Sequence, residues 1–350
     1  MCIRDSSISL FGSANAGELA VSGTAKATYN ILSGKSNVGK GLGITNELNF
    51  TAAGELDNGY TWSYSMELDP DAVSSGSIGT AENDDTKLTL TTPMGTVGVF
   101  ISEGGLDVED AASQSVYARP TDSGDPSSGD GDNFTIDSYN NIQYHMAADM
   151  LPFGIVGKIA YAPDLDTDKN SGNAKGNART MTTTTAGRSA TEYQVKAAPI
   201  DGLAIGASYF DFDGSGIDGT KMNQAPESGA YFATYATGPF SVGYSKAFKA
   251  PLVVDGALTS TTAVDFYEQT NMSIAYAASD DLSISYEKEE DQKNMQRDAT
   301  ADVEQESTSI QVAYTMGGMT LAVAHGSYDN VGYVEGAEID QMLFAVTMAF

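Results

Sequence analysis

Apolar and polar residues alternate with a period of two along most of the chain. In Tyr60–Leu68 every even-numbered residue is aromatic or apolar, and the residues between them are Thr, Ser or Glu. A β-strand has this period because successive side chains point to opposite faces. The pattern recurs in sixteen segments, among them Phe153–Tyr161 and Leu282–Lys288. We therefore predict an all-β fold of sixteen antiparallel strands.

The connections between these segments are of two kinds that alternate along the chain. Seven are short, and most contain glycine or proline, the residues that favour tight turns; they lie near Asp57, Pro93, Pro152, Pro199, Pro239, Asp280 and Gly317. Eight longer polar segments separate them. Short turns at one end and long loops at the other are typical of a transmembrane β-barrel. No window reaches the ~18 apolar residues of a membrane helix.

Aromatic residues support the membrane interpretation, because they fall at both ends of the predicted strands. One row lies beside the short turns: Tyr60, Phe153, Tyr235, Phe240, Tyr276 and Tyr314. The other lies at the far strand ends: Tyr29, Tyr161, Tyr209, Tyr244, Tyr286 and Tyr328. Two such rows are expected at the two membrane interfaces.

Charge narrows the classes of partner. The chain has 18 Lys and Arg residues against 47 Asp and Glu residues, a formal charge of −29. This balance argues against nucleic acid and anionic lipid headgroups, which need clustered basic residues, and favours cations. The single cysteine, Cys2, leaves no disulfide framework and no thiolate metal cluster.

The N-terminus is similar to the end of a secretory signal. Ser7–Ala16 has a short apolar piece and an Ala14-Asn15-Ala16 cleavage pattern. We expect residues 1–16 to be a signal-peptide remnant and residues 17–350 to be one exported barrel.

One connection, Glu103–Asp137, is much longer than the others. It joins the fifth and sixth predicted strands and carries only one basic residue, Arg119. Its nine acids are Glu103, Asp107, Glu109, Asp110, Asp122, Asp125, Asp130, Asp132 and Asp137.

Together these features resemble the Gram-negative general diffusion porin family, of the alphaproteobacterial type. The resemblance covers Gly17–Phe350 and includes a final alternating strand, DQMLFAVTMAF, that ends in an aromatic residue. It implies a bacterial outer-membrane location, contact with lipid and lipopolysaccharide, a homotrimer, and an assembly signal at Phe350. In the family the third loop folds inward and narrows the pore, which here would be Glu103–Asp137. The second loop, Pro70–Asp84, would contact a neighbouring subunit.

The resemblance also suggests how charge is arranged in the channel. Strand parity points eight charged or titratable side chains inward: Lys26, Glu47, Glu67, Lys87, His145, Lys158, Glu192 and Lys196. Lys26 and Lys87 belong to the wall that faces the third loop in the family. We expect a constriction formed by the loop residues Glu103, Asp107, Glu109, Asp110 and Arg119 together with Lys26, Lys87, Lys158, Lys196, Glu47 and Glu67. The excess of acids predicts passive diffusion of ions and small hydrophilic solutes with cation selectivity.

The candidate metal site is incomplete, and we expect no resident cofactor. Asp164, Asp166 and Asp168 have the alternation of a calcium-binding loop. The glycine at the sixth position is missing, and Lys175 stands where a bidentate Glu is needed. Weak Ca²⁺ binding is the most this pattern predicts.

Three other functions compete with a general diffusion channel. A barrel hydrolase needs a positioned His, but only His145 and His325 are present, and neither has a catalytic motif around it. A phosphate channel would need an arginine ladder, which is absent, whereas loop tyrosines such as Tyr117 and Tyr139 leave a sugar- or amino-acid-specific porin open. Thr180–Thr185 gives slight support to a surface adhesin.

Overall fold

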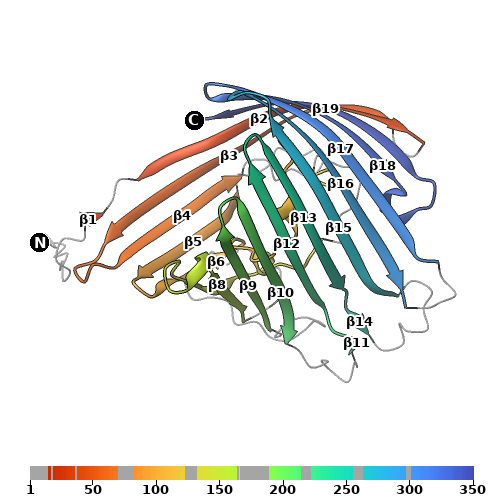
Figure 1. Ribbon diagram of the computed structural model, residues 1–350. Helices are drawn as coiled ribbons and strands as arrows, with labels where there is room; N and C mark the ends of the chain where they lie inside the picture. Colours follow the sequence, from red (N-terminus) through yellow and green to blue (C-terminus); the bar gives the residue numbers. More distant parts are fainter. Residues whose placement is uncertain are drawn as a thin grey trace, which may run out of the picture.

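The computed structural model describes residues 15–16, 19–35, 38–69, 82–122, 132–163, 165, 189–213, 222–254, 263–296 and 301–350. Long strands dominate these ranges, joined by short turns and a few 3₁₀ turns. Figure 1 shows the strands tilted side by side in chain order. Within the described ranges, no helix has the length and apolar character needed to cross a membrane.

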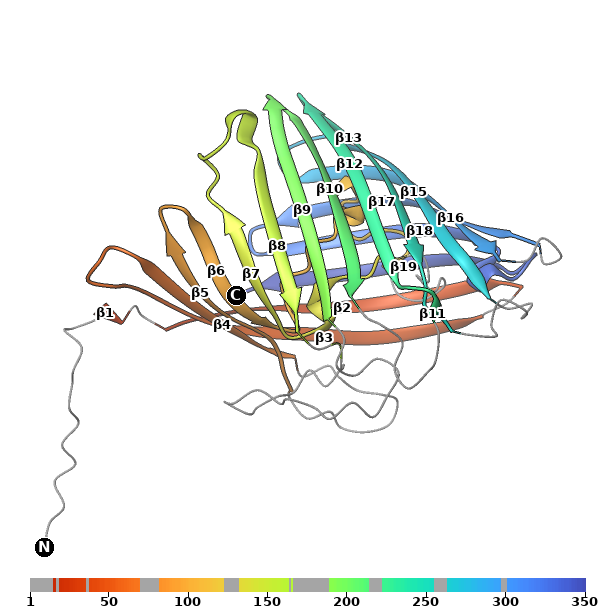
Figure 2. The same ribbon diagram turned by 90° about the horizontal axis from the view of Figure 1, so that it is seen from below.

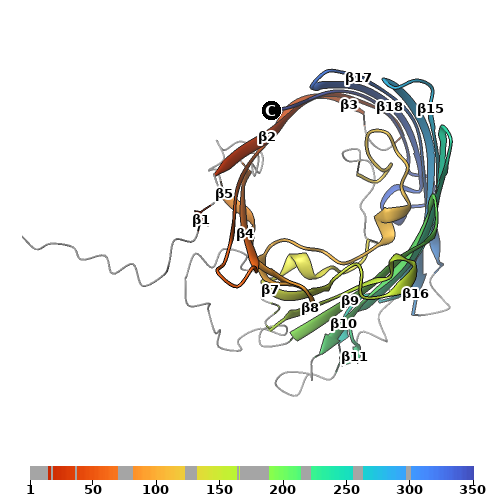
Figure 3. The same ribbon diagram turned by 60° about the vertical axis from the view of Figure 1, so that its left-hand side comes forward.

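Sixteen antiparallel strands form a closed barrel, as predicted. Each pairs with its chain neighbours, and β19 pairs with β2 to close the ring, which Figures 2 and 3 show from two further sides. The strands are β2 (Ala20–Gly34), β3 (Gly39–Glu55), β4 (Thr61–Asp69), β5 (Glu82–Thr92), β6 (Gly95–Ile101), β7 (Asn141–Met146), β8 (Val156–Ala162), β9 (Ser189–Ile200), β10 (Leu203–Asp213), β12 (Glu227–Thr237), β13 (Phe240–Ala250), β15 (Val264–Ala277), β16 (Leu282–Met295), β17 (Val303–Met316), β18 (Met319–Asp329) and β19 (Glu338–Ala349).

The two faces of the barrel follow the alternation in the sequence. Apolar side chains such as Val323 and Phe344 are about two-fifths exposed on the outside, at 40% and 43%. The residues between them turn inward and are small or polar, including Ala324 and Gln341, which are almost fully buried. An apolar exterior around a polar interior suits a barrel in lipid.

The seven short turns predicted from the sequence fall at one end of the barrel. Gly202, between β9 and β10, has φ 77°, a left-handed conformation that glycine adopts without a steric penalty. The turn between β7 and β8 is longer, because it includes the 3₁₀ turn η3 (Pro152–Gly154). Phe153 lies in η3 with φ 62°, so its prediction as the start of a strand was wrong.

Two further predictions need correction. The first connection at the opposite end spans only residues 35–38, so long and short connections do not alternate strictly. Tyr328 was assigned to the outer aromatic row, but it is 0% exposed and points inward. It shares the parity of Ala322 and Ala324, and its ring lies over Gly326, where there is no side chain to obstruct it.

Several short elements lie outside the predicted pattern. Strand β1 (Asn15–Ala16) pairs with Gly54 and Glu55 of β3, while residues 1–14 of the predicted leader lie outside the described residues. A separate two-stranded sheet joins β11 (Met222–Gln224) and β14 (Val253–Val254). Most of the predicted second loop, residues 70–81, is also outside the described ranges.

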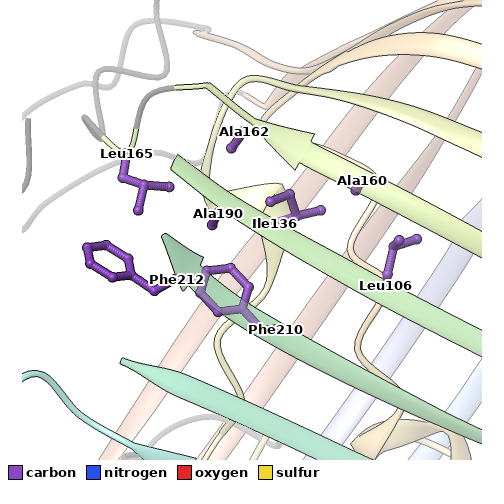
Figure 4. Close-up of a cluster of buried hydrophobic side chains, with 8 residues drawn as sticks. All are labelled: Leu106, Ile136, Ala160, Ala162, Leu165, Ala190, Phe210 and Phe212. Atoms are coloured by element: carbon purple, nitrogen blue, oxygen red, sulfur yellow. The ribbon is translucent and has the colours of Figure 1, made fainter. Parts of the chain in front are cut away.

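The largest cluster of buried apolar side chains in the described structure lies on the inner surface of the barrel wall. Leu106 and Ile136, from the segment between β6 and β7, pack against inward-facing residues of β8 to β10 (Figure 4). Those wall residues are Ala160, Ala162, Ala190, Phe210 and Phe212, together with Leu165 just after β8. Small alanines in the wall leave room for the segment to approach it closely.

Candidate functional site

Between β6 and β7, the described residues 102–122 and 132–140 lie inside the ring of strands (Figure 3, gold and yellow). We call residues 102–140 the lumen loop. Its backbone N–H groups donate to side chains on the inner wall: Leu106 to Glu192, Val108 to Ser208, Gln114 to Ser273, Val116 to Ser285, and Tyr117 to Gln311. These contacts run from β9 round to β17, so the loop lies along the wall.

Wall side chains satisfy loop backbone groups in both directions. On β9, Glu192 accepts hydrogen bonds from the N–H groups of Leu106 (3.3 Å) and Ile136 (2.9 Å). Gln194 donates to the carbonyl of Leu106 at 2.7 Å. A buried loop needs such partners because an unpaired buried backbone group costs free energy. Glu192, predicted to point inward, is thus a docking residue for both ends of the loop.

The side chain of Glu109, a residue of the lumen loop, is buried and does not face the open channel. It begins the 3₁₀ turn η1 (Glu109–Ala112) and is 4% exposed. Its carboxylate accepts the N–H of Asn133 at 2.9 Å, and its carbonyl accepts the Ser245 hydroxyl at 2.7 Å. Burial, reinforced by Asp107, raises the pKa of Glu109 to about 8.

Arg119 is the centre of an ion-pair network that ties the loop to the wall. It is 5% exposed, and its guanidinium pairs with Asp110, with Asp132 at 3.1 Å, with Asp122 at 3.4 Å, and with Glu289 of β16 at 3.0 Å. Burial alone would lower the pKa of Arg119, but Glu289 and the aspartates hold it above its ordinary value.

The exposed side of this network is acidic. One guanidinium faces four carboxylates, and the side chains of Asp110, Asp122 and Asp132 are 54%, 51% and 39% exposed. The predicted constriction residues near Arg119 therefore divide into two groups. Asp110 presents its carboxylate to solvent, while Glu109 and Arg119 serve the internal structure of the loop.

The opposite wall, formed by β2 to β5, carries four of the predicted side chains. Register places Lys26, Glu47, Glu67 and Lys87 on its inner face. Lys87 pairs with Glu103 at the start of the loop, at 2.5 Å, and the ammonium group of Lys26 lies 5.8 Å from the centre of the Tyr117 ring. Glu47 accepts a 3.3 Å hydrogen bond from Thr24. Lys26 therefore contacts the middle of the loop, whereas Lys87 pairs with its first residues, directly beside β6.

The other predicted residues fall in different places. His145 and Lys158 are directly opposite each other on β7 and β8, and Lys196 is on β9, all on the inner face. Asp164, Asp166 and Asp168 lie outside the described residues. Phe350 follows β19 and exchanges two backbone hydrogen bonds with Gly23, at 2.9 and 3.0 Å.

Sequence reasoning missed the docking residues on the second half of the barrel. Glu287 accepts hydrogen bonds from the hydroxyl groups of Ser113 (2.6 Å) and Ser115 (2.5 Å). Gln311 accepts from Tyr117 and donates to Ala118, and Tyr328 donates to the carbonyl of Pro120 at 2.9 Å. All three share the inward parity of their strands, so alternation marked their direction but not their partner.

Comparison with known proteins agrees with this architecture. The sequence matches the Gram-negative porin family over residues 5–349, and the chain belongs to that family. No curated protein matches it. Members of this family are outer-membrane channels and not enzymes, so the chain forms a channel in the bacterial outer membrane.

Solved structures show the same fold at low sequence identity. OmpF of Salmonella typhi, solved with daunomycin, has a TM-score of 0.66 at 13% identity, covering 95% of this chain and 98% of that one. An anion-selective porin from Comamonas acidovorans gives 0.64 at 10%, with coverage of 96% and 100%. The trimer form of OmpT from Vibrio cholerae gives 0.59 at 14%, with coverage of 96% and 100%.

Proposed function

We propose that the channel allows passive diffusion of ions and small hydrophilic solutes and favours cations. The acidic face of the Arg119 network carries this proposal, because three half-exposed aspartates project from a loop held inside the barrel. Charges inside a pore act on ions at close range, within the ~8 Å over which physiological salt leaves them unscreened. Lys87 adds little opposing charge, because Glu103 neutralises it.

The test is the reversal potential in a KCl gradient across a planar bilayer. Replacing Asp110, Asp122 and Asp132 by Asn keeps the size of each side chain and removes three negative charges. The ratio of cation to anion permeability should fall by about twofold or more, since each charge lies near the ion path. The matched control replaces three acids at the short turns: Asp201, Asp280 and Asp281. An equal change in both triple variants would contradict the proposal.

Subunit association is a second part of the proposal. We infer a homotrimer, in line with the trimer form of OmpT among the similar structures. The outer face of β3 supports a protein neighbour there, since Leu42 and Ile44 are 83% and 70% exposed. Ile44→Asp should shift the protein from trimer to monomer in light scattering, whereas Ile310→Asp, at an outward residue of β17, should not. Dissociation by both variants would argue against this face.

A substrate-specific channel is the alternative. The two loop tyrosines that suggested it do not form an open row, since Tyr117 lies beside Lys26 and Tyr139 packs against the Leu106 cluster. Conductance that saturates with one sugar or amino acid would favour the specific channel. Absence of any conductance would favour an adhesin. Weak calcium binding at Asp164, Asp166 and Asp168 stays a prediction, to be checked by calcium titration with a melting readout.

A further inference from the structure

Two lysines lie on the inner wall, on the short-turn side of the place where the lumen loop contacts β9. On β9, Gln194 holds the carbonyl of Leu106 at 2.7 Å, and Lys196 is two residues further toward the short turn at 201–202. A strand rises about 3.3 Å per residue, so Lys196 is roughly 7 Å past the loop contact. Lys158, on the neighbouring strand β8, is directly opposite Gln194. Both lysines therefore lie at the short-turn side of the loop.

The same register brings three basic side chains into one row. Lys196 is opposite Val156, so Lys158 is its diagonal neighbour, a relation that places Cβ atoms about 7–8 Å apart. His145 of β7 is directly opposite Lys158, which corresponds to about 5 Å between Cβ atoms. All three are partly buried. We call Lys158, Lys196 and His145 the basic row.

Within the described parts of the chain, no carboxylate pairs with the basic row. Lys196 lies over the Phe232 ring at 5.7 Å, and the His145 Nε2 atom is 2.6 Å from Gln143 Oε1. The nearby carboxylate of Glu192 already accepts two loop N–H groups. Four other lysines, Lys35, Lys87, Lys246 and Lys288, each pair with a glutamate.

We propose that the basic row is a binding site for small oxyanions, the carboxylate or phosphate groups of solutes that cross the channel. Each lysine offers an ammonium group on a flexible stem, so the two can converge on the oxygens of one anion. Partial burial strengthens their attraction for a negative charge relative to bulk water. The site rests on the proposed function only in requiring an open lumen, and it adds an anion-binding step to a pore whose loop favours cations.

Single-channel recording with acetate, succinate and inorganic phosphate tests the site. Wild-type current carried by potassium should fall in a saturable way as the oxyanion concentration rises. Lys158→Gln combined with Lys196→Gln should raise the apparent Kd about tenfold, from two lost interactions each worth somewhat under 1 kcal/mol. Block by succinate alone would identify carboxylates as the ligand, and block by phosphate alone would identify phosphates.

The matched control is Lys249→Gln combined with Lys293→Gln. These inward lysines stack on other rings, Lys249 on Phe134 at 4.9 Å and Lys293 on Tyr333 at 5.2 Å, and their loss changes the charge equally. Equal weakening in both double variants, or an unchanged Kd in the first, overturns the site. Conductance without saturable block by any of the three anions also overturns it and leaves the channel function intact. If wild type conducts no current, the channel proposal fails, and calorimetric titration of detergent-solubilised protein with succinate and phosphate decides the site independently.

Discussion

At the scale of single residues, Gly243 sets how closely the lumen loop can approach the wall. It faces inward on β13, and a Cβ atom built there would collide with the backbone carbonyl of Ala112 in η1. Gly243→Ala should push η1 away from the wall and lower the free energy of unfolding by about 1–3 kcal/mol, as overpacking does. Denaturant unfolding in detergent would measure the loss. Gly41→Ala on β3 is the control, because no atom lies within 4 Å of its added Cβ.

The hydroxyl group of Tyr328 binds the lumen loop near Pro120. Its O–H group contacts the carbonyl of Pro120 at 2.9 Å and Gln341 Oε1 at 3.0 Å in a fully buried site. Tyr328→Phe should cost about 1–2 kcal/mol, because it removes the buried hydrogen bonds of this hydroxyl group. We expect larger fluctuations of the open-channel current. Tyr314→Phe removes the same group from an outward-facing residue that is 42% exposed, and quiet current is expected there.

At the scale of elements, the Arg119 network joins the two arms of the lumen loop to β16. Asp110 and Asp122 come from the part of the loop that follows β6 (residues 102–122), and Asp132 comes from the part that precedes β7 (residues 132–140). Glu289 comes from the wall. Arg119→Met should destabilise the docked loop by about 3–5 kcal/mol, because Glu289 would remain buried without its cation. Protease sensitivity of the loop would report its release. Adding Glu289→Gln to Arg119→Met should restore part of the protection, and no recovery would show that the charge of Glu289 is not the cause.

Glu109 makes loop docking depend on pH. Its pKa is about 8 in the docked loop, above the ordinary value of 4.5, because burial and the nearby Asp107 and Asp132 outweigh the Asn133 N–H and Arg119, which lower it. The docked state therefore favours the protonated acid. Docking is strongest below about pH 4.5, weakens by up to about 1.4 kcal/mol per pH unit as pH rises, and becomes constant above about pH 8. In the wild type, the noise of the open-channel current should therefore increase as pH rises over the same range.

Glu109→Gln is the variant that isolates this effect. The amide cannot ionise and can still accept the N–H of Asn133, so the noise should stay near its low-pH level from pH 5 to pH 9. Glu47→Gln, on the opposite wall, changes charge without touching the buried carboxyl and should retain the wild-type pH curve. A flat wild-type curve would contradict a docking role for the ionisation of Glu109.

The elements could be predicted from the sequence because alternation and turn residues are local signals. Every one of the sixteen strands was found, and parity alone placed Lys26, Lys158 and Glu192 on the inner face. The role of Tyr328 was missed, since aromatic position alone does not tell a membrane interface from a loop anchor. The burial of Glu109 was missed for another reason. It depends on contacts between residues distant in sequence, such as Glu109 with Ser245 and Asn133.

At the scale of the whole molecule, the lumen loop divides the channel into regions of different charge. The network around Arg119 exposes carboxylates, while Lys158 and Lys196 lie at its short-turn side without acidic partners in the described structure. The wall of β2 to β5 touches the loop through Lys26 and Lys87. A solute would thus meet acidic and basic groups in succession, an arrangement in which the proposed cation preference and the proposed local anion binding are compatible.

Phe350 contributes to the seam that closes the barrel between β19 and β2. Phe350 extends the pairing of β19 with β2 by two backbone hydrogen bonds to Gly23, and its ring covers Gly23, where a Cβ atom would lie 2.9 Å from the ring.

Phe350→Ala keeps the backbone bonds and removes the ring. Phe344→Ala is the matched control, since Phe344 is also an outward aromatic on β19, stacked on Tyr29 at 6.4 Å. If the ring is an assembly signal, Phe350→Ala should lower the amount inserted in the outer membrane of cells severalfold more than Phe344→Ala. In refolding into liposomes, where no assembly machinery is present, the two losses should be similar, at about 1–2 kcal/mol each for an incompletely buried aromatic. Equal losses for the two variants in cells would show that the Phe350 ring is not an assembly signal. A larger loss for Phe350→Ala in liposomes would show that the ring stabilises the contact between β19 and β2.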